Sequence, residues 1–244
     1  MMRDLIFLLS ALLCEILGTI GGFGSSVFFV PVAQFFYSFQ FVLGITGVLH
    51  VFSNISKLIL FGKHVNYRLL FFYGIPSVGF VVLGAYLTTI VSFNWAEITL
   101  GVFLVVFSSI LLLFSNITLP PNKTNALISG SLAGFIAGFN GTGGAIRGIS
   151  MAAFNLQKDV FVATSAAVDF GVDISRSAIY IDHGYFTKDM IYLIPFLIII
   201  SFLGSFIGKR LLNKIDETVF KKIVLVLVLI VGIAILFKET LKFF

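Results

Sequence analysis

Two long apolar runs, each interrupted by a cluster of glycines, constrain this chain more than any other feature of its sequence. The second interruption consists of Asn140, Gly141, Thr142, Gly143 and Gly144, with Arg147 shortly after it. Backbone in hydrocarbon must satisfy its own hydrogen bonds, so such a break is tolerated only where it faces protein or a water-filled cavity. The helix that restarts there would point unpaired N–H groups into that cavity, and the guanidinium adds positive charge. The break therefore predicts an anion site.

The composition places most of this chain in a lipid bilayer. It is 59% hydrophobic and 11% charged, whereas a soluble domain carries roughly 25% charged residues. The single cysteine, Cys14, excludes an internal disulfide and a cysteine-based metal site. The net charge of +5 comes without a basic patch interleaved with aromatics, so nucleic acid is not an expected partner. The N-terminal apolar run resembles a signal peptide but lacks a cleavage site, so we expect it to stay in the fold.

The first interrupted run, residues 5–37, is too long for a single crossing. As one helix its 33 residues would extend about 50 Å, against a hydrocarbon core of about 30 Å. Two short helices fit better, either as a re-entrant hairpin or as two short crossings. Gly22 and Gly24 allow the turn between them, and Ser25 or Ser26 is placed to cap the second helix.

The remaining apolar segments complete a two-part organisation. We expect a first repeat over 1–118, a linker over 119–125 and a second repeat over 126–244. The first repeat contains the broken hairpin 5–37 and spans 41–61, 67–91 and 98–114. The second contains the broken hairpin 126–154 and spans 160–181, 190–208 and 219–237. The predicted fold is an all-α integral membrane protein, with a broken re-entrant helical hairpin and three transmembrane helices in each half.

The two halves match at a constant shift of 119 residues. The shift pairs Gly22 with Gly141, Gly24 with Gly143, His50 with Asp169, Asn54 with Asp173, Lys57 with Arg176, His64 with His183, and Pro76 with Pro195. An odd number of crossings in each half inverts the second relative to the first, which predicts an inverted repeat whose two breaks meet near the midplane. Lysines and arginines on the predicted loops divide nine against four between the two sides. This excess predicts that both termini lie on the non-cytoplasmic side of the membrane.

The candidate substrate-binding residues come from the two breaks and from cations inside spans. They are Gly22, Gly24, Ser25, Ser26, Asn54, Lys57, Asn140, Gly141, Thr142, Gly143, Gly144, Arg147 and Arg176. Ionisable residues inside spans are costly and favour a functional reading. Alternatives remain open: Arg147 could extend to the headgroups or pair with an acid for structure, and Lys57 and Arg176 could anchor helix ends or neutralise nearby acids. Asn54 could hydrogen-bond an oxyanion or only join helices.

Three further residues are candidates for proton coupling. Asp169 and Asp173 lie one turn apart, and an ion pair between Asp173 and Arg176 is the structural alternative. Asp169 would then be left to carry a proton, and His50, its counterpart at the shift of 119, could pair with it and titrate near neutral pH. Glu15, in the first short helix, could equally face the cavity or be buried in its protonated form.

The glycine clusters do not predict an enzyme or a cofactor site. They lack a preceding strand and a Gly-Lys-Ser/Thr ending, so nucleotide loops are excluded. No spacing of His, Cys and Glu predicts a metal site, and nothing in the sequence brings a Ser-His-Asp set together. We therefore expect no enzymatic activity, no metal and no cofactor.

With these residues in hand, the chain resembles the TauE/SafE sulfite exporter family, also called the toluene sulfonate uptake permease family. The resemblance rests on Gly22-Phe23-Gly24-Ser25-Ser26 with Pro31 downstream, on the echo Gly141-Thr142-Gly143-Gly144, and on the units around Asn54, Lys57 and Gly62 and around Asp173, Arg176 and His183-Gly184. It implies a multi-pass inner-membrane transporter of sulfite, sulfonates or related sulfur-containing anions. The chain departs from the pattern where Ser150 matches Pro31 and where Arg147 matches Phe28.

These observations together predict transport of a small oxyanion, sulfite or an organosulfonate, by alternating access. An anion channel with the same site and a membrane scaffold that binds a partner protein are the other classes left open. The expected partners are the anion and the lipid bilayer. The sequence does not give the direction of transport, the coupling ion or the oligomeric state.

Overall fold

The computed structural model describes residues 2–22, 24–91, 93–114, 122–154, 156–212, 214 and 217–240, and these residues form helices without strands. The α-helices are α1 (Met2–Gly21), α2 (Ser26–Ala33), α3 (Phe39–Phe61), α4 (Tyr67–Leu69), α5 (Ile75–Ile90), α6 (Phe93–Leu113), α7 (Lys123–Asn140), α8 (Gly144–Ala153), α9 (Lys158–Asp182), α10 (Ile194–Leu212) and α11 (Glu217–Thr240). Two 3₁₀ segments, η1 (Gly62–His64) and η3 (Lys188–Leu193), and a π-helical segment, η2 (Leu70–Gly74), complete the set.

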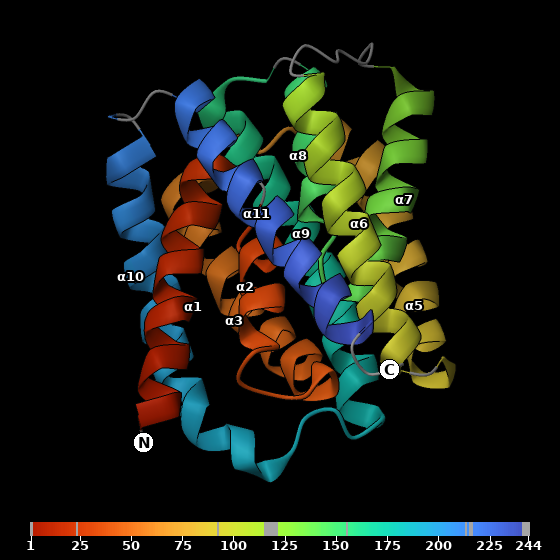
Figure 1. Cartoon of the computed structure of the whole chain (residues 1–244). Helices are drawn as coiled ribbons and strands as arrows, with labels where there is room; N and C mark the ends of the chain where they lie inside the picture. Colours follow the sequence, from red (N-terminus) through yellow and green to blue (C-terminus); the bar gives the residue numbers. More distant parts are fainter. Residues whose placement is uncertain are drawn as a thin grey trace.

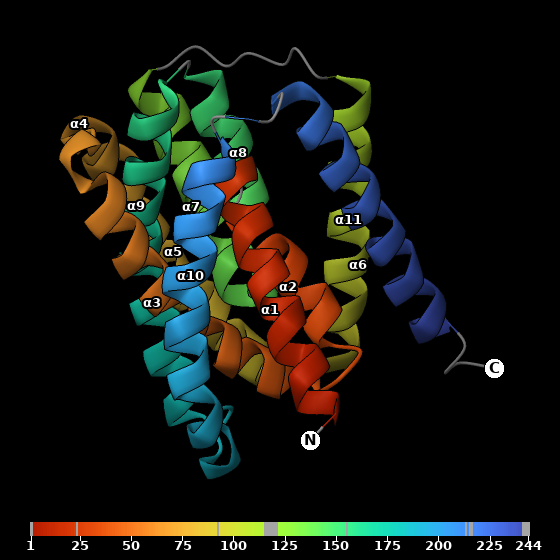
Figure 2. The ribbon, with the colours of Figure 1, turned by 90° about the vertical axis from the view of Figure 1, so that its left-hand side faces the viewer.

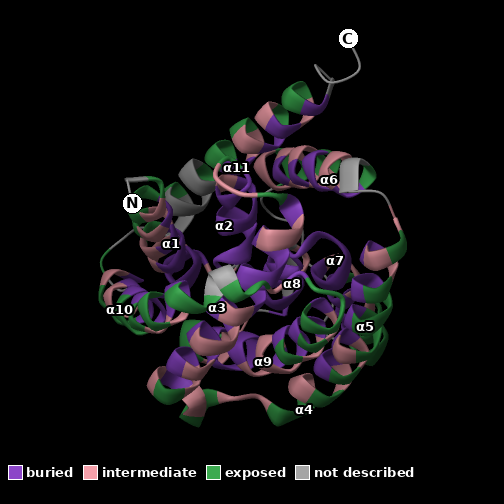
Figure 3. Cartoon of the chain, turned by 90° about the horizontal axis from the view of Figure 1, so that it is seen from below, coloured by how far each residue is buried: buried purple, intermediate pink, exposed green. Residues whose placement is uncertain are grey.

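The helices form one bundle in which α2 and α8 are surrounded by the longer helices (Figure 1). Helix α1 starts at the end where α11 finishes, and α2 turns back toward that end (Figures 1 and 2). Helix α7 starts at the opposite end, and α8 turns back toward it. The two short helices therefore run in opposite directions from the middle of the bundle. Figure 3 shows buried residues gathered around α2 and α8 and exposed residues on the outer helices.

The outside of the bundle is apolar, as a lipid-facing surface must be. Large apolar side chains such as Leu13, Ile90 and Phe196 are more than half exposed. Among the described residues, five helical segments are long and apolar enough to cross a membrane: Arg3–Gly21, Phe39–His64, Tyr67–Ile90, Trp95–Leu113 and Ile191–Leu212. Helix α9 falls outside this set although it is the longest of the described helices, and it carries Asp169, Asp173 and Arg176 in its middle.

Small residues let pairs of helices approach closely. On α7, Gly130, Gly134 and Gly138 lie against backbone carbonyls four residues apart on η2 and α5, so that an added Cβ would overlap them. The Ser77 hydroxyl joins the same two helices by donating to the Gly130 carbonyl at 2.9 Å. On α10, Gly204 and Gly208 lie against Glu15 and Thr19 of α1 in the same way. Such small-xxx-small seams hold helices together in lipid, where apolar side chains gain little by pairing.

The chain reverses between the paired helices through left-handed backbone. Gly22, Gly24 and Gly141 have φ angles of 68°, 78° and 74°, a region that glycine enters without the steric cost of a side chain. The arms of the first hairpin are unequal: α1 has 20 residues and α2 has eight. The expectation of two short helices is therefore wrong for α1. Of the two helices, α1 is long and apolar enough to cross a membrane, whereas α2 is not. Ser25 occupies the N-cap position of α2, but its side chain makes no cap hydrogen bond, so the predicted capping role is also wrong.

Prolines explain the irregular segments. Pro76 follows the π-helical η2, and Pro195 follows the 3₁₀ segment η3. Proline removes one backbone donor and clashes with the carbonyl four residues earlier, which disturbs the turn that precedes it.

Helix ends in the two parts of the chain are related by the shift seen in the sequence. Helix α1 ends at 21 and α7 at 140; α3 begins at 39 and α9 at 158; α5 begins at 75 and α10 at 194, a difference of 119 each time. Helices α3 and α9 pack against one another, as do α6 and α11. Helix α5 packs on α7, and α10 packs on α1. Each of these last two contacts therefore joins the first part of the chain to the second.

Candidate functional site

A small polar cavity lies where the first break meets α3, α8 and α9. Its volume is about 20 Å³, which is room for about one water molecule. Gly22 and Gly24 line it from the first break, and Arg147 lines it from α8. A Cβ added to Gly24 would lie 3.1 Å from Arg147 Nη2, so glycine lets the backbone approach the guanidinium. The other lining residues are Gly18, Thr19, Asn54, Lys57, Val162, Ser165, Ala166 and Asp169.

Lys57 is held at the cavity by a buried carboxylate from α1. Its ammonium lies 2.9 Å from Glu15 Oε1 and donates to Ser53 Oγ at 2.7 Å. Ser25 and Ser53 donate to the two Glu15 oxygens at 2.6 and 2.5 Å, and Ser205 of α10 approaches at 3.2 Å. Glu15 is fully buried and Lys57 is 7% exposed. Groups from α1, α3, α10 and the first break thus satisfy one ion pair, and Lys57 stays buried inside the bundle.

Arg147 pairs with Asp169 across the same cavity. The guanidinium, 4% exposed, donates to the Asp169 carboxylate. Its Nε atom has no hydrogen-bond partner among the described residues. One part of this cation is therefore satisfied by a carboxylate that itself lines the cavity, and another part is left without a partner.

Arg176 is the counterpart of Lys57 at the shift of 119, and it contacts residues that correspond to part of the cavity lining. It binds Asp173 through Nε at 2.8 Å and Nη2 at 2.7 Å, as the structural alternative anticipated. Its Nη1 donates to the carbonyls of Ala137 at 3.3 Å and Gly141 at 2.7 Å. These two residues are the counterparts, 119 positions later, of Gly18 and Gly22, which line the cavity. A longer side chain thus fills the space that Lys57 leaves open.

His50 lies between the Glu15–Lys57 pair and the Asp173–Arg176 pair. Its Nε2 lies 3.0 Å from Ser25 Oγ. Because the Ser25 hydroxyl donates its hydrogen to Glu15, its oxygen is free to accept one from the imidazole. On the other side, His50 Nδ1 lies 3.9 Å from Asp173 Oδ2, and Asn54 donates to that same oxygen at 2.6 Å. The pairing of His50 with Asp169 expected from the sequence is replaced, among the described contacts, by one with Asp173.

The predicted residues separate into two groups. Gly22, Gly24, Asn54, Lys57, Arg147 and Asp169 line the cavity, whereas Ser25, Ser26, Asn140, Gly141, Thr142, Gly143, Gly144, Arg176, His50 and Asp173 do not. Gly143 packs against Ala133 and Ala137 of α7, and Gly141 packs against Leu43. The side chains of Asn140 and Thr142 are fully buried without a hydrogen-bond partner in the described part of the chain. The first break therefore faces the cavity, and the second faces the packed interior.

Sequence reasoning gave too little weight to Glu15. Its counterpart at the shift of 119 is Gly134, so the repeat pattern carried no signal for a carboxylate there. The available signal was an acid within an apolar helix, which requires a cation partner. Gly18 and Thr19, which also line the cavity, lie on the face of α1 that packs against the turn and α10.

The described ion pairs balance in charge. Lys57, Arg147 and Arg176 face Glu15, Asp169 and Asp173 respectively. Buried charges of this kind are tolerated because each has a partner at contact distance. The site as it stands is therefore neutral when His50 is neutral, and its cations are already occupied by internal carboxylates.

Comparison with known proteins gives one match. The family model described as Sulfite exporter TauE/SafE matches residues 7–235. That range covers both breaks, all three ion pairs and the helices that hold them. No curated protein and no solved structure matches the chain.

Proposed function

The chain belongs to the TauE/SafE sulfite exporter family, and from this premise we propose that it transports small sulfur-containing anions, sulfite or an organosulfonate, across the cell membrane. The family implies a multi-pass membrane transporter for sulfite or related anions, and the apolar helices agree with that environment. The observation that carries the site assignment is the small cavity between the first break and α8, lined by both Lys57 and Arg147.

We further propose that the two parts of the chain, 1–118 and 126–244, form an inverted repeat. The constant shift of helix ends and the opposite directions of α1 and α7 support it (Figure 1). So does the hydrogen bond between Asn54 and Asp173, which are counterparts at that shift. Counterparts come into contact where a two-fold axis passes between them. The repeat axis would then lie between α3 and α9, beside the cavity.

The size of the cavity supports alternating access. A space for about one water molecule does not hold sulfite, so the anion enters only if the elements around it separate. Helices α2 and α8 are short, start in the middle of the bundle and carry the breaks at their N-termini. Movement of either helix would open the site toward one end. This favours a carrier over a channel, which would hold an open path.

The ion pairs link anion binding to a proton. An incoming anion that binds the part of the Arg147 guanidinium now paired with Asp169 displaces that carboxylate, and a displaced buried carboxylate without a partner is strongly unfavourable. Uptake of a proton by Asp169 removes that penalty. The other charges acting on Asp169 are Lys57 and Arg176, and Asp173 lies one turn away on the same helix. A bound monoanion, an organosulfonate or hydrogen sulfite, is then accompanied by one proton, which keeps the site neutral.

Uptake by proteoliposomes tests this function. We expect saturable uptake of sulfite that is stimulated by unlabelled sulfite on the far side and driven by an inward proton gradient. Arg147→Gln should weaken sulfite binding at least thirty-fold, because truncating one partner of a buried charge pair costs about 2–5 kcal/mol. Lys63→Gln, at an exposed residue away from the cavity, is the matched control. Ionic current without saturation would instead identify a channel, and unchanged binding in the Arg147 variant would refute the site.

A further inference from the structure

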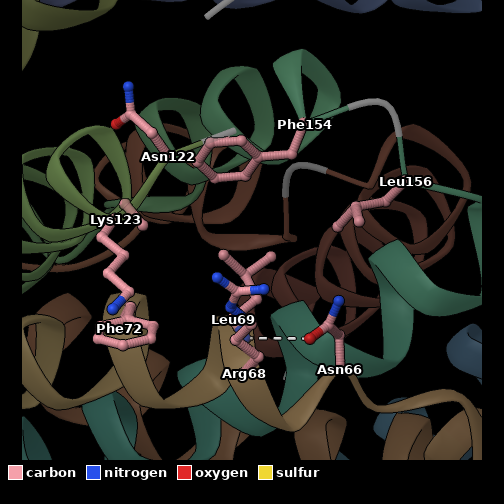
Figure 4. A pocket seen from close by; sticks show the side chains of 9 residues that line it. Asn66, Arg68, Leu69, Phe72, Asn122, Lys123, Phe154 and Leu156 are labelled. Atoms are coloured by element: carbon pink, nitrogen blue, oxygen red, sulfur yellow. Dashed lines mark hydrogen bonds between the residues drawn. The ribbon is translucent and has the colours of Figure 1, made fainter. Parts of the chain in front are cut away.

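A second, much larger cavity lies at the end of the bundle where α7 begins and α8 finishes. Its volume is about 480 Å³, within the range of roughly 300–1,000 Å³ typical of sites for organic ligands. Figure 4 shows its walls: residues of α4 and η2 on one side, the start of α7 on another, and the segment after α8 above. It shares no lining residue with the small cavity that holds Lys57 and Arg147.

The wall of this cavity is largely apolar. Leu69, Phe72, Ala126, Phe154 and Leu156 supply most of it, and Phe154 and Ala126 are buried. The apolar surface continues out of the cavity along the same helical turns, because Tyr67 and Phe71 are 76% and 59% exposed. The cavity therefore opens beside a surface suited to lipid rather than only to water.

Two cations line the cavity without a carboxylate partner among the described residues. Arg68 and Lys123 are exposed, and the lining contains no acid. Figure 4 shows the end of the Lys123 side chain beside the Phe72 ring, and its ammonium lies 5.0 Å from the ring centre. This is a contact of cation and aromatic ring, which leaves the charge uncompensated. Lys57, Arg147 and Arg176 each have a carboxylate, so the two cations here differ from every cation of the ion-pair site.

Two asparagines add hydrogen-bond donors to the same cavity. Asn66 and Asn122 each use the side-chain oxygen to accept a backbone N–H, from Leu69 at 3.0 Å and from Asn125 at 2.7 Å. Those bonds fix the two amides and leave the nitrogen of each as a donor. The cavity thus combines positive charge, amide donors and an extended apolar wall.

We propose that this cavity binds an anionic phospholipid, with its phosphate held by Arg68 and Lys123 and part of an acyl chain against Phe154 and Leu156. Basic pockets between membrane helices recognise anionic headgroups in this way. The apolar wall separates this ligand from sulfite, which has no apolar part to cover it. The site does not depend on the transport function proposed above.

Native mass spectrometry of the purified full chain with phosphatidylglycerol tests the proposal. The double variant Arg68→Gln/Lys123→Gln should bind this lipid roughly thirty-fold more weakly, since each cation near an anionic headgroup contributes about fivefold in affinity. The matched control is Lys63→Gln/Lys158→Gln, which removes two exposed cations that do not line the cavity. We expect the control to bind as the parent does, and phosphatidylcholine to bind weakly to all three proteins. Equal melting temperatures in detergent would show that both variants are folded.

Three results would overturn this assignment. The first is unchanged phosphatidylglycerol binding in the Arg68/Lys123 variant. The second is an equal loss of phosphatidylglycerol binding in the control variant, which would indicate general attraction by exposed cations instead of a defined site. The third is binding of inorganic phosphate, glycerol phosphate or toluenesulfonate as tightly as the lipid and with the same dependence on Arg68 and Lys123, because the cavity would then serve a soluble anion.

Discussion

The pair formed by Glu15 and Lys57 offers the sharpest test of how this protein keeps charge in its interior. At 2.9 Å between Lys57 Nζ and Glu15 Oε1, Coulomb's law gives an attraction of about 6 kcal/mol at an effective dielectric constant of about 20. Transfer of the two ions from water costs several kcal/mol each and offsets most of this. The pair therefore adds little net stability, yet neither partner can be removed alone.

A double-mutant cycle separates these contributions. Glu15→Gln leaves a 7% exposed ammonium without a carboxylate, bonded only to neutral oxygens such as Ser53 Oγ, and Lys57→Met leaves a fully buried carboxylate. We expect each to reduce the free energy of unfolding by about 3–5 kcal/mol. The double variant removes both charges and should lose less than either single variant. Lys63→Met, at an exposed site, should change the free energy by less than about 0.5 kcal/mol.

Unfolding by SDS in mixed micelles at neutral pH measures these differences. A double variant whose loss equals the sum of the two single losses would refute the reasoning, because the charges would then act independently. A loss below about 1 kcal/mol in both single variants would also refute it. That result would mean that water reaches both groups and that the pair is not buried in solution.

Three further outcomes follow from the same geometry. Asp169→Asn should make the binding of toluenesulfonate, whose own charge is constant, independent of pH between about 6 and 8 in calorimetry, because the carboxylate that takes up the coupled proton is gone. The parent's pH dependence in the variant would contradict the coupling. Gly24→Ala should lower the free energy of unfolding by about 1–3 kcal/mol, because alanine is strained at a φ of 78°, and should reduce sulfite uptake. Gly62→Ala, with open space around the added Cβ, should change neither quantity. Gly134→Leu should abolish monodisperse protein in gel filtration because its side chain would overlap the Ser77 carbonyl, and Gly79→Leu, facing open space, should be tolerated.

The sequence predicted the helical membrane fold because its signals are local. Long apolar runs and left-handed glycines can each be recognised without knowledge of their neighbours. The cap at Ser25 failed for the opposite reason. A serine before a short helix ordinarily bonds to the helix backbone, but here Glu15, ten residues earlier, accepts its hydrogen. The local capping rule failed because the buried Glu15 carboxylate needs hydrogen-bond donors and takes the Ser25 hydroxyl as one of them.

Partners among buried charges were harder to predict than their presence. The pairing of Asp173 with Arg176 was foreseeable, because the residues lie three apart on one helix. Arg147 with Asp169 and Glu15 with Lys57 join different helices, and only packing brings them together. The shift of 119 was misleading for His50, since counterparts of a repeat need not touch. His50 instead approaches Asp173, the residue one turn further along α9.

The division of the ion pairs along the chain has a consequence for biogenesis. Glu15 and Lys57 both belong to the first 118 residues, while Arg147, Asp169, Asp173 and Arg176 all follow residue 125. A ribosome delivers the first of these groups to the membrane while the second is still being translated. In that first group, the buried Glu15 already has Lys57 as its partner. Ser77 on α5 can donate to the Tyr73 carbonyl of the preceding turn at 2.8 Å, so its hydroxyl does not depend on α7. Glu15 and Lys57 can therefore pair within the bilayer before α7 arrives to cover α5.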